Sequence, residues 1–265
     1  MPAGRERLHT DFLCCIKIVG DFELGNGHNW EIEQNDVDLT FYPKQLNCFD
    51  ASCIELALRC KLERPGDVTL SAVTVSNGDD LRFFKPIYAL GADRCLQISS
   101  TADLRFAPAS VAAELAAFAG RQAFDWLLFG SYQSIGQNGA TGILTAHALN
   151  LPCYTGVMDF CLDGDGLCVT YRVDDALLTE TFSPPGVLVL DDRVTTLLRT
   201  PTMKQRLTAG ARAVLTQDGG QGAPLIKDPL LERLGEEHTE HVCEMVDAQQ
   251  LARRMLALCR KEGTV

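Results

Sequence analysis

The chain has 265 residues, of which 46% are hydrophobic and 22% charged, and this composition predicts one globular domain, or one domain with an arm. The formal net charge of −11 disfavours binding to nucleic acid, and the sequence contains no apolar run near the ~20 residues that a membrane helix needs. Eleven cysteines without a CxxC pair disfavour a zinc or iron–sulfur site and favour a reducing cytoplasm.

The N-terminal part predicts a strand followed by a helix. Residues 12–19 are almost all apolar and indicate a buried strand, after which a polar stretch runs to residue 38. Asp50 or Ser52 can cap the helix that follows, and Ser52 with Glu55 matches a capping box. The apolar residues of this helix recur at helical spacing: Ile54, Ala57, Leu58 and Leu62.

Further strands and helices alternate along the next part of the chain. Residues 68–75 and 95–98 predict strands, whereas residues 80–90 and 108–121 predict helices. Alternation of this kind indicates βαβ units and a parallel sheet. Ligands of such sheets bind beyond the carboxyl ends of the strands, so we expect four loops to lie near that edge: 20–22, 47–50, 76–79 and 130–142.

The segment from residue 124 to residue 151 carries the strongest sign of a ligand site. Residues 126–129 predict a buried parallel strand, and residues 143–149 have a helical pattern. The small and glycine-rich loop between them would direct backbone N–H groups and the positive end of a helix dipole toward one point, which suits a phosphate. A plain strand-to-helix turn without a ligand is the alternative.

The pattern changes after Pro152. Residues 153–162 and 167–173 flank Asp163-Gly164-Asp165-Gly166, which predicts a β-hairpin, and residues 176–182 are compatible with one more strand. Residues 186–190 predict a buried strand that returns to the sheet. Residues 193–217 contain no acidic residue and form a basic island with five cations: Arg193, Arg199, Lys204, Arg206 and Arg212.

These elements predict an α/β fold with an open, mostly parallel twisted sheet, helices on both faces, a β-hairpin excursion and a C-terminal arm. Residues 1–217 would form the α/β domain that carries the expected phosphate site. Residues 218–265 include a terminal helix over 247–262 and have too little sequence around them for a core of their own. We therefore expect this arm to pack on a partner subunit through Leu251, Met255 and Leu258.

Several short segments match a known family pattern in the same order. CCIK at 14–17, with Val19 and Asp21, is similar to VCIKxVPD, and NCFD at 47–50 is similar to NPYD. Four more segments are similar to family motifs: ALGADR at 89–94 to AMGADR, DWLLFG at 125–130 to DLVLLG, QSI at 133–135 to QAI, and LNLP at 149–152 to LLGLP. On these matches, over roughly residues 12–205, the chain resembles the β subunit of electron transfer flavoproteins, the FixA-like family.

The resemblance implies an electron carrier without catalytic residues of its own. The chain would pair with an electron transfer flavoprotein α subunit that holds a redox-active FAD, and a flavin-dependent dehydrogenase of the acyl-CoA type would supply electrons. Its own pocket would hold AMP or, in electron-bifurcating members, a second FAD. The family aspartates after QAI are replaced here by Gly136-Gln137-Asn138.

The resemblance also implies which residues form the pocket. Phe22 stands where the family has an aromatic residue near the flavin ring of the partner, and a core aromatic is the alternative for it. The cofactor-binding residues would be Cys15, Asn47, Cys48, Phe49, Asp50, Asn77, Ser134, Gly136, Gln137, Asn138, Gly139, Ala140, Thr141 and Gly142.

A partner-docking site is expected in the basic island. TTLLRTPTM at 195–203 resembles the family's docking element, RYPTLxxIMKAKKK, and its apolar anchor corresponds to Leu197, Leu198, Pro201 and Met203. An apolar anchor among like charges suits a short-lived contact with an acidic surface, and we expect Leu198 to be a hot spot. Packing of both leucines under the loop is the alternative.

Other functions have less support in the sequence. A non-redox adenine-nucleotide-binding module shares the same α/β plan, but the sequence lacks a Walker GK[ST] loop, and a hydride-transferring enzyme would need a GxGxxG fingerprint that is also missing. His238 and His241 with Cys243 lack a second pair of metal ligands, so an exposed acidic stretch is the better interpretation.

Overall fold

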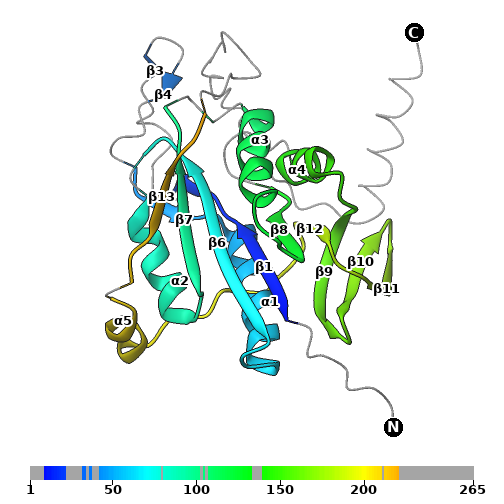
Figure 1. The fold of residues 1–265 in the computed structure, drawn as a ribbon. Coiled ribbons are helices and arrows are strands. Elements are labelled where there is room, and N and C mark those ends of the chain that lie inside the picture. The colour runs from blue at the N-terminus through cyan, green and yellow to red at the C-terminus, as the bar shows by residue number, and fades with distance from the viewer. Residues whose placement is uncertain are drawn as a thin grey trace, which may run out of the picture. The chain divides into compact units, whose positions relative to one another are not determined.

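The fold is built on one large sheet. The computed structural model describes residues 9–21, 32–33, 36–37, 42–78, 80–101, 104, 107–132, 139–210 and 212–220. The strands of the sheet are β1 (Thr10–Cys15), β6 (Val68–Ser76), β7 (Arg94–Ser99), β8 (Trp126–Gly130), β9 (Cys153–Asp163), β10 (Gly166–Val173), β11 (Ala176–Phe182), β12 (Gly186–Leu190) and β13 (Leu215–Asp218). Their spatial order is β11-β10-β9-β12-β8-β1-β6-β7-β13 (Figure 1).

Most neighbouring strands in the sheet are parallel. From β9 through β12, β8, β1, β6 and β7 to β13, every pair runs in the same direction. The other two strands form an antiparallel meander, in which β10 pairs with β9 and with β11. The predicted parallel sheet and the predicted hairpin excursion are therefore both confirmed.

Helices cover both faces of the sheet. The described helices are α1 (Cys48–Glu63), the 3-10 turn η2 (Leu81–Phe83), α2 (Phe84–Leu90), α3 (Pro108–Ala119), α4 (Thr141–Leu149) and α5 (Met203–Ala209). One hydrophobic cluster joins the sheet to α1 and α2, and a second cluster joins the opposite face to α3 and α4. The sequence prediction of helices on both faces is thus confirmed.

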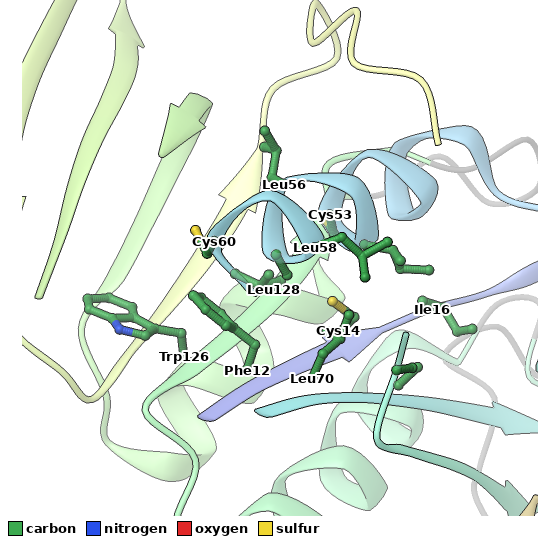
Figure 2. Close-up of a cluster of buried hydrophobic side chains, with 14 of the residues drawn as sticks. Phe12, Cys14, Ile16, Cys53, Leu56, Leu58, Cys60, Leu70, Trp126 and Leu128 are labelled. Carbon is green, nitrogen blue, oxygen red and sulfur yellow. The ribbon is translucent and has the colours of Figure 1, made fainter. Parts of the chain in front are cut away.

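The central strands show why the sheet is buried on two sides. Phe12 and Cys14 of β1 face the α1 cluster, whereas Leu13 and Cys15 face the α3 and α4 cluster. Figure 2 shows Phe12 and Cys14 beside Leu128 of β8 beneath helix α1. A continuous apolar run places apolar side chains on both buried faces of the sheet, as is usual for strands of a parallel sheet.

The first strand is shorter than the sequence predicted. β1 ends at Cys15, and its last register partner in β6 is Val73. Residues 18–20 form a separate strand, β2 (Ile18–Gly20), which pairs antiparallel with β5 (Lys44–Leu46). A second short pair joins β3 (Ile32–Glu33) to β4 (Asp36–Val37). The single strand predicted over 12–19 was wrong because residues 16–17 belong to no strand and residues 18–20 pair with β5 outside the large sheet.

Helix α1 differs from the prediction in its N-terminal capping and in the exposure of Leu62. Its N-cap is Asn47, and no side chain of the described residues caps it. Ser52 and Glu55 are buried and bind a distant segment, so the predicted capping box was wrong. Leu62 is 62% exposed, because it lies near the last turn of the helix, beyond the core cluster that covers Leu58.

Two elements lie where the sequence analysis placed none. Helix α5 begins with a capping box between Thr202 and Gln205, and β13 adds as an edge strand parallel to β7. The strand runs to Asp218, one residue past the expected domain boundary. The expected C-terminal helix and its partner-facing residues lie outside the described residues. No helix in the described part of the chain is long and apolar enough to cross a membrane.

Candidate functional site

A pocket lies at the carboxyl ends of β1, β6 and β8. These strands contribute Cys15, Val75 and Gly130 to its lining. The loop regions at 47–50 and 130–142, which the sequence placed near this edge, both contribute lining residues as well. This is the position where parallel α/β sheets bind ligands.

The first turns of three helices also line this pocket. Asn47 and Asp50 come from α1, Pro108 and Val111 from α3, and Thr141 with Gly142 from α4. The N-cap residues of these last two helices, Ala107 for α3 and Ala140 for α4, have no side-chain oxygen that could cap them. Their first N–H groups and the positive ends of their dipoles therefore favour an anion in the pocket.

The carboxylate of Asp50 forms the frame of the pocket. It is buried and accepts hydrogen bonds from the backbone N–H groups of Lys17 at 2.8 Å and Gly130 at 3.0 Å. The start of α1 is thereby tied to the segments that follow β1 and β8. Burial raises the pKa of Asp50 to about 6, although hydrogen bonds from Asn47, Lys17 and Gly130 oppose the rise.

Two glycines make this close packing possible. A Cβ atom on Gly130 would lie 2.6 Å from Oδ1 of Asp50 and 2.6 Å from Cβ of Phe49. A Cβ atom on Gly142 would lie 2.9 Å from Cγ2 of Val189, so glycine lets α4 begin directly against β12. Both residues are required by contact rather than by an unusual backbone angle.

The loop after β8 is joined to α1 by one hydrogen bond and carries one buried hydroxyl that has no partner among the described residues. Nδ2 of Asn47 donates to the carbonyl of Tyr132 at 2.8 Å, which joins this loop to α1. The hydroxyl of Ser131 is buried, and no hydrogen-bond partner for it exists among the described residues. Because Ser131 also lines the pocket, this hydroxyl is available to a ligand.

One side of the lining is apolar. Val75, Leu104, Val111 and Leu115 form this part together with Cys15. Burial raises the pKa of the Cys15 thiol well above its ordinary value, so the side chain is a neutral, small hydrophobe. The pocket therefore combines an anion-attracting side with an apolar side.

The structure brings together part of the residue set expected from the sequence. Six of its members line the pocket: Cys15, Asn47, Asp50, Gly139, Thr141 and Gly142. Phe49 packs against the ring of Tyr132, Cys48 is exposed, and Ala140 is the N-cap of α4. Asn77 is exposed and does not line the pocket. The other expected residues, Phe22, Ser134, Gly136, Gln137 and Asn138, lie outside the described residues.

Several lining residues were missed by the sequence analysis. Ser131 follows directly after the end of β8, and Lys17 lies two residues after the end of β1, which is a usable positional signal. The α3 residues were missed because the loop after β7 was not counted among the carboxyl-end loops, although Pro108 marks the start of that helix.

A second candidate surface is the segment from Asp191 to Thr202, here called the strap, together with α5. Leu197 is 84% exposed, and Met203 and Leu207 of α5 are 73% and 76% exposed. Leu198 instead packs against the α1 core cluster, and Pro201 is buried. Of the four expected docking residues, Leu197 and Met203 are thus displayed, whereas Leu198 and Pro201 face inward.

The charges of the basic island are not all free. Arg199 forms a salt bridge with Glu55, and Nε of Arg206 donates to the carbonyl of Pro201 at 3.3 Å. Lys204 is exposed. Within the described part of the chain, no cluster of three or more His, Cys, Asp and Glu side chains is arranged to hold a metal ion.

Comparison with known proteins connects the chain to one family. The family model described as "Electron transfer flavoprotein domain" matches residues 40–217, well over half of the chain. A protein of Escherichia coli (strain K12) with the name "Putative electron transfer flavoprotein subunit YgcR" is 28% identical over 194 residues, which cover 72% of this chain and 74% of that protein. The family match includes helices α1, α3 and α4 and the strap.

Proposed function

The chain belongs to the electron transfer flavoprotein family, whose proteins carry electrons, and we propose that it is the β-type subunit of a heterodimeric carrier. The β assignment is supported by the order of the matching segments, from CCIK at 14–17 to LNLP at 149–152. An α-type subunit would hold the redox-active FAD, which supplies the electron-accepting chemistry. This chain would contribute binding and docking surfaces and no catalytic residue.

The pocket at the strand ends would bind the adenylate part of a nucleotide. The observation that carries this proposal is that the first turns of α3 and α4 line the same pocket as the Ser131 hydroxyl, which has no hydrogen-bond partner among the described residues. The N–H groups of α4 and the Ser131 hydroxyl would bind phosphate. The apolar side, which includes Val75 and Val111, would contact the base.

The size of the nucleotide distinguishes two kinds of carrier. AMP in the pocket corresponds to a simple carrier, and a second FAD corresponds to an electron-bifurcating complex. Both contain an adenylate, so both fit the features above. The replacement of the family aspartates by Gly136-Gln137-Asn138 removes negative charge near a polyanion and is compatible with either.

The strap and α5 would dock the flavin-dependent dehydrogenase that supplies electrons. Exposed Leu197, Met203 and Leu207 lie within residues 193–217, which contain five cations and no acidic residue, although the whole chain has a net charge of −11. Such a surface is complementary to an acidic partner that offers an apolar socket. Charge would speed the encounter, and the apolar side chains would hold the complex briefly.

Co-expression with an α-type subunit tests the subunit assignment. We expect the two chains to purify as a 1:1 complex with bound flavin, which absorbs visible light. A chain that purifies alone in the presence of the α-type subunit, without flavin in the preparation, would reject the assignment. A non-redox adenine-nucleotide-binding module would give that second result and would still bind AMP.

A further inference from the structure

A buried carboxylate on helix α1 holds the strap in place. Glu55 has a side chain that is 7% exposed, and it forms a salt bridge with Arg199 of the strap. Its carboxylate accepts hydrogen bonds from Nε of Arg199 at 3.0 Å and from the backbone N–H of Arg199 at 3.1 Å. Burial raises the pKa of Glu55, but the hydrogen bonds and the charge of Arg199 outweigh burial, so the pKa lies below its ordinary value.

The strap is fixed at two further points. Oγ of Ser52, one turn before Glu55, donates to the carbonyl of Thr196 at 2.7 Å. At the beginning of the strap, buried Asp191 accepts hydrogen bonds from the Arg172 side chain at 2.7 and 3.1 Å and from the backbone N–H of Arg193 at 2.9 Å. Both the backbone and the side chains of the strap are therefore bound to the core of the protein.

These contacts lie directly on either side of the exposed leucine. Thr196 is bound by Ser52, Arg199 is bound by Glu55, and Leu198 packs against the core. Leu197, between them, is 84% exposed. A large apolar side chain is thus displayed on a backbone that is fixed one residue before it and two residues after it.

A buried carboxylate is costly unless it is paired, so an arrangement of this kind in a surface loop calls for an explanation. Fixing the loop removes the entropy that a free loop would lose when it binds a partner. Arg199, whose charge is matched by Glu55, would then act on the shape of the strap. It would contribute little to the attraction of an acidic partner.

We propose that Glu55 is a positioning residue for electron exchange, because its pairing with Arg199 holds the strap in the conformation that presents Leu197 to the partner protein. This inference rests on the proposed docking function of the strap. Glu55 touches neither nucleotide nor flavin in this role. It acts through Arg199 and the backbone on which Leu197 is carried.

The test uses two variants of the Glu55–Arg199 pair, here called the clamp variants, and one matched control, all in the full heterodimer. Glu55→Gln removes the buried charge, and Arg199→Lys keeps the positive charge but cannot form the same forked contact. Glu63→Gln changes the net charge as Glu55→Gln does, at an exposed position in the last turn of the same helix. Hydrogen exchange of residues 194–200 reports the strap, and steady-state electron exchange with the dehydrogenase gives KM and kcat.

We expect faster hydrogen exchange in the strap of both clamp variants, together with a rise in KM for the dehydrogenase of about five- to tenfold, because only a fraction of molecules would hold the binding conformation. The kcat value, the flavin content and the dimer should stay as in the wild type. Glu63→Gln should match the wild type in every measurement. A merely structural role would alter hydrogen exchange without this change in KM.

Three results would overturn the inference. Unchanged hydrogen exchange in both clamp variants would show that the pair does not hold the strap. Faster exchange with unchanged KM would show that strap position does not affect docking. If Glu55→Gln fails to fold, Arg199→Lys decides between the outcomes. A Leu197→Ala variant distinguishes failure of the positioning role of Glu55 from failure of the docking function. If the KM of Leu197→Ala is also unchanged, the docking function itself is rejected, and with it this inference.

Discussion

The carboxylate of Asp50 accepts a hydrogen bond from the backbone N–H of Gly130, 3.0 Å away, although 80 residues separate them in the chain. The same carboxylate binds the N–H of Lys17 at 2.8 Å. The start of α1 is therefore joined to the ends of two neighbouring central strands at the edge where the candidate pocket lies. These contacts determine the shape of the pocket, and several measurable consequences follow from them.

Replacing Gly130 with alanine should damage both stability and the pocket. The added Cβ would lie 2.6 Å from Asp50 Oδ1 and from Phe49 Cβ, so α1 must move away from β8. We expect a loss of about 1–3 kcal/mol in the free energy of unfolding, as for overpacked cores, together with weaker nucleotide retention. Gly210→Ala is the control, because its Cβ would have ordinary contacts at 3.5 Å. Equal melting temperatures for the two variants would contradict this account.

The raised pKa of Asp50 predicts a specific pH dependence of stability. Because the pKa in the folded state is about 6, against 3.8 for the ordinary side chain, this group favours folding most below about pH 4. Its contribution falls as the pH rises toward 6, by about 3 kcal/mol in total. The difference in unfolding free energy between the wild type and Asp50→Asn should fall by most of that amount from pH 4 to pH 7. A difference that stays constant over this range would show that the pKa is not raised.

Replacing Ser131 with alanine should have opposite effects on binding and on the free protein. The hydroxyl is buried without a partner among the described residues, so its removal should leave the melting temperature of the nucleotide-free protein unchanged or slightly raised. If the hydroxyl binds a phosphate, AMP affinity measured by calorimetry should fall roughly two- to tenfold. Ser183→Ala, at an exposed position outside the pocket lining, should alter neither value. Unchanged AMP affinity in Ser131→Ala would remove this residue from the site.

The two neighbouring leucines of the strap should respond differently to alanine. Leu197 is exposed, so Leu197→Ala should leave stability unchanged and weaken docking to the dehydrogenase by about 1–3 kcal/mol if it is a hot spot. Leu198 packs against the core, so Leu198→Ala should lower stability by about 1–3 kcal/mol. Electron-exchange kinetics with the dehydrogenase measure docking in both variants, and thermal unfolding measures their stability. Weakened docking in Leu198→Ala alone, without loss of stability, would restore the expectation from the sequence.

The locally encoded parts of the fold could be predicted from the sequence. The apolar runs at 126–129 and 186–190 appear as buried strands β8 and β12, and the glycine-rich loop leads into helix α4, as the pattern indicated. In each case the signal lies within a few neighbouring residues. Burial on both faces of a parallel sheet requires such continuous apolar runs, so the sequence and the fold agree there.

The features that were missed depend on distant parts of the chain. Ser52 and Glu55 have the spacing of a capping box, but their partners Thr196 and Arg199 lie 144 residues away. Strand β13 is short and mostly exposed, so no alternation of apolar residues marks it. The contribution of α3 to the pocket follows from the strand order, which places β7 beside β6, and not from any local motif.

The central claim is that this subunit binds an adenine nucleotide in the pocket framed by Asp50, besides the FAD of its partner. The most direct measurement is to denature the purified heterodimer, release its ligands, and count flavin and adenine nucleotide per dimer by chromatography and mass spectrometry. Our account predicts either one FAD with one AMP or two FAD molecules per dimer, and a lower count of the second nucleotide in Gly130→Ala. A wild-type heterodimer that releases one FAD and no second nucleotide, and that binds neither added AMP nor added FAD, would contradict it.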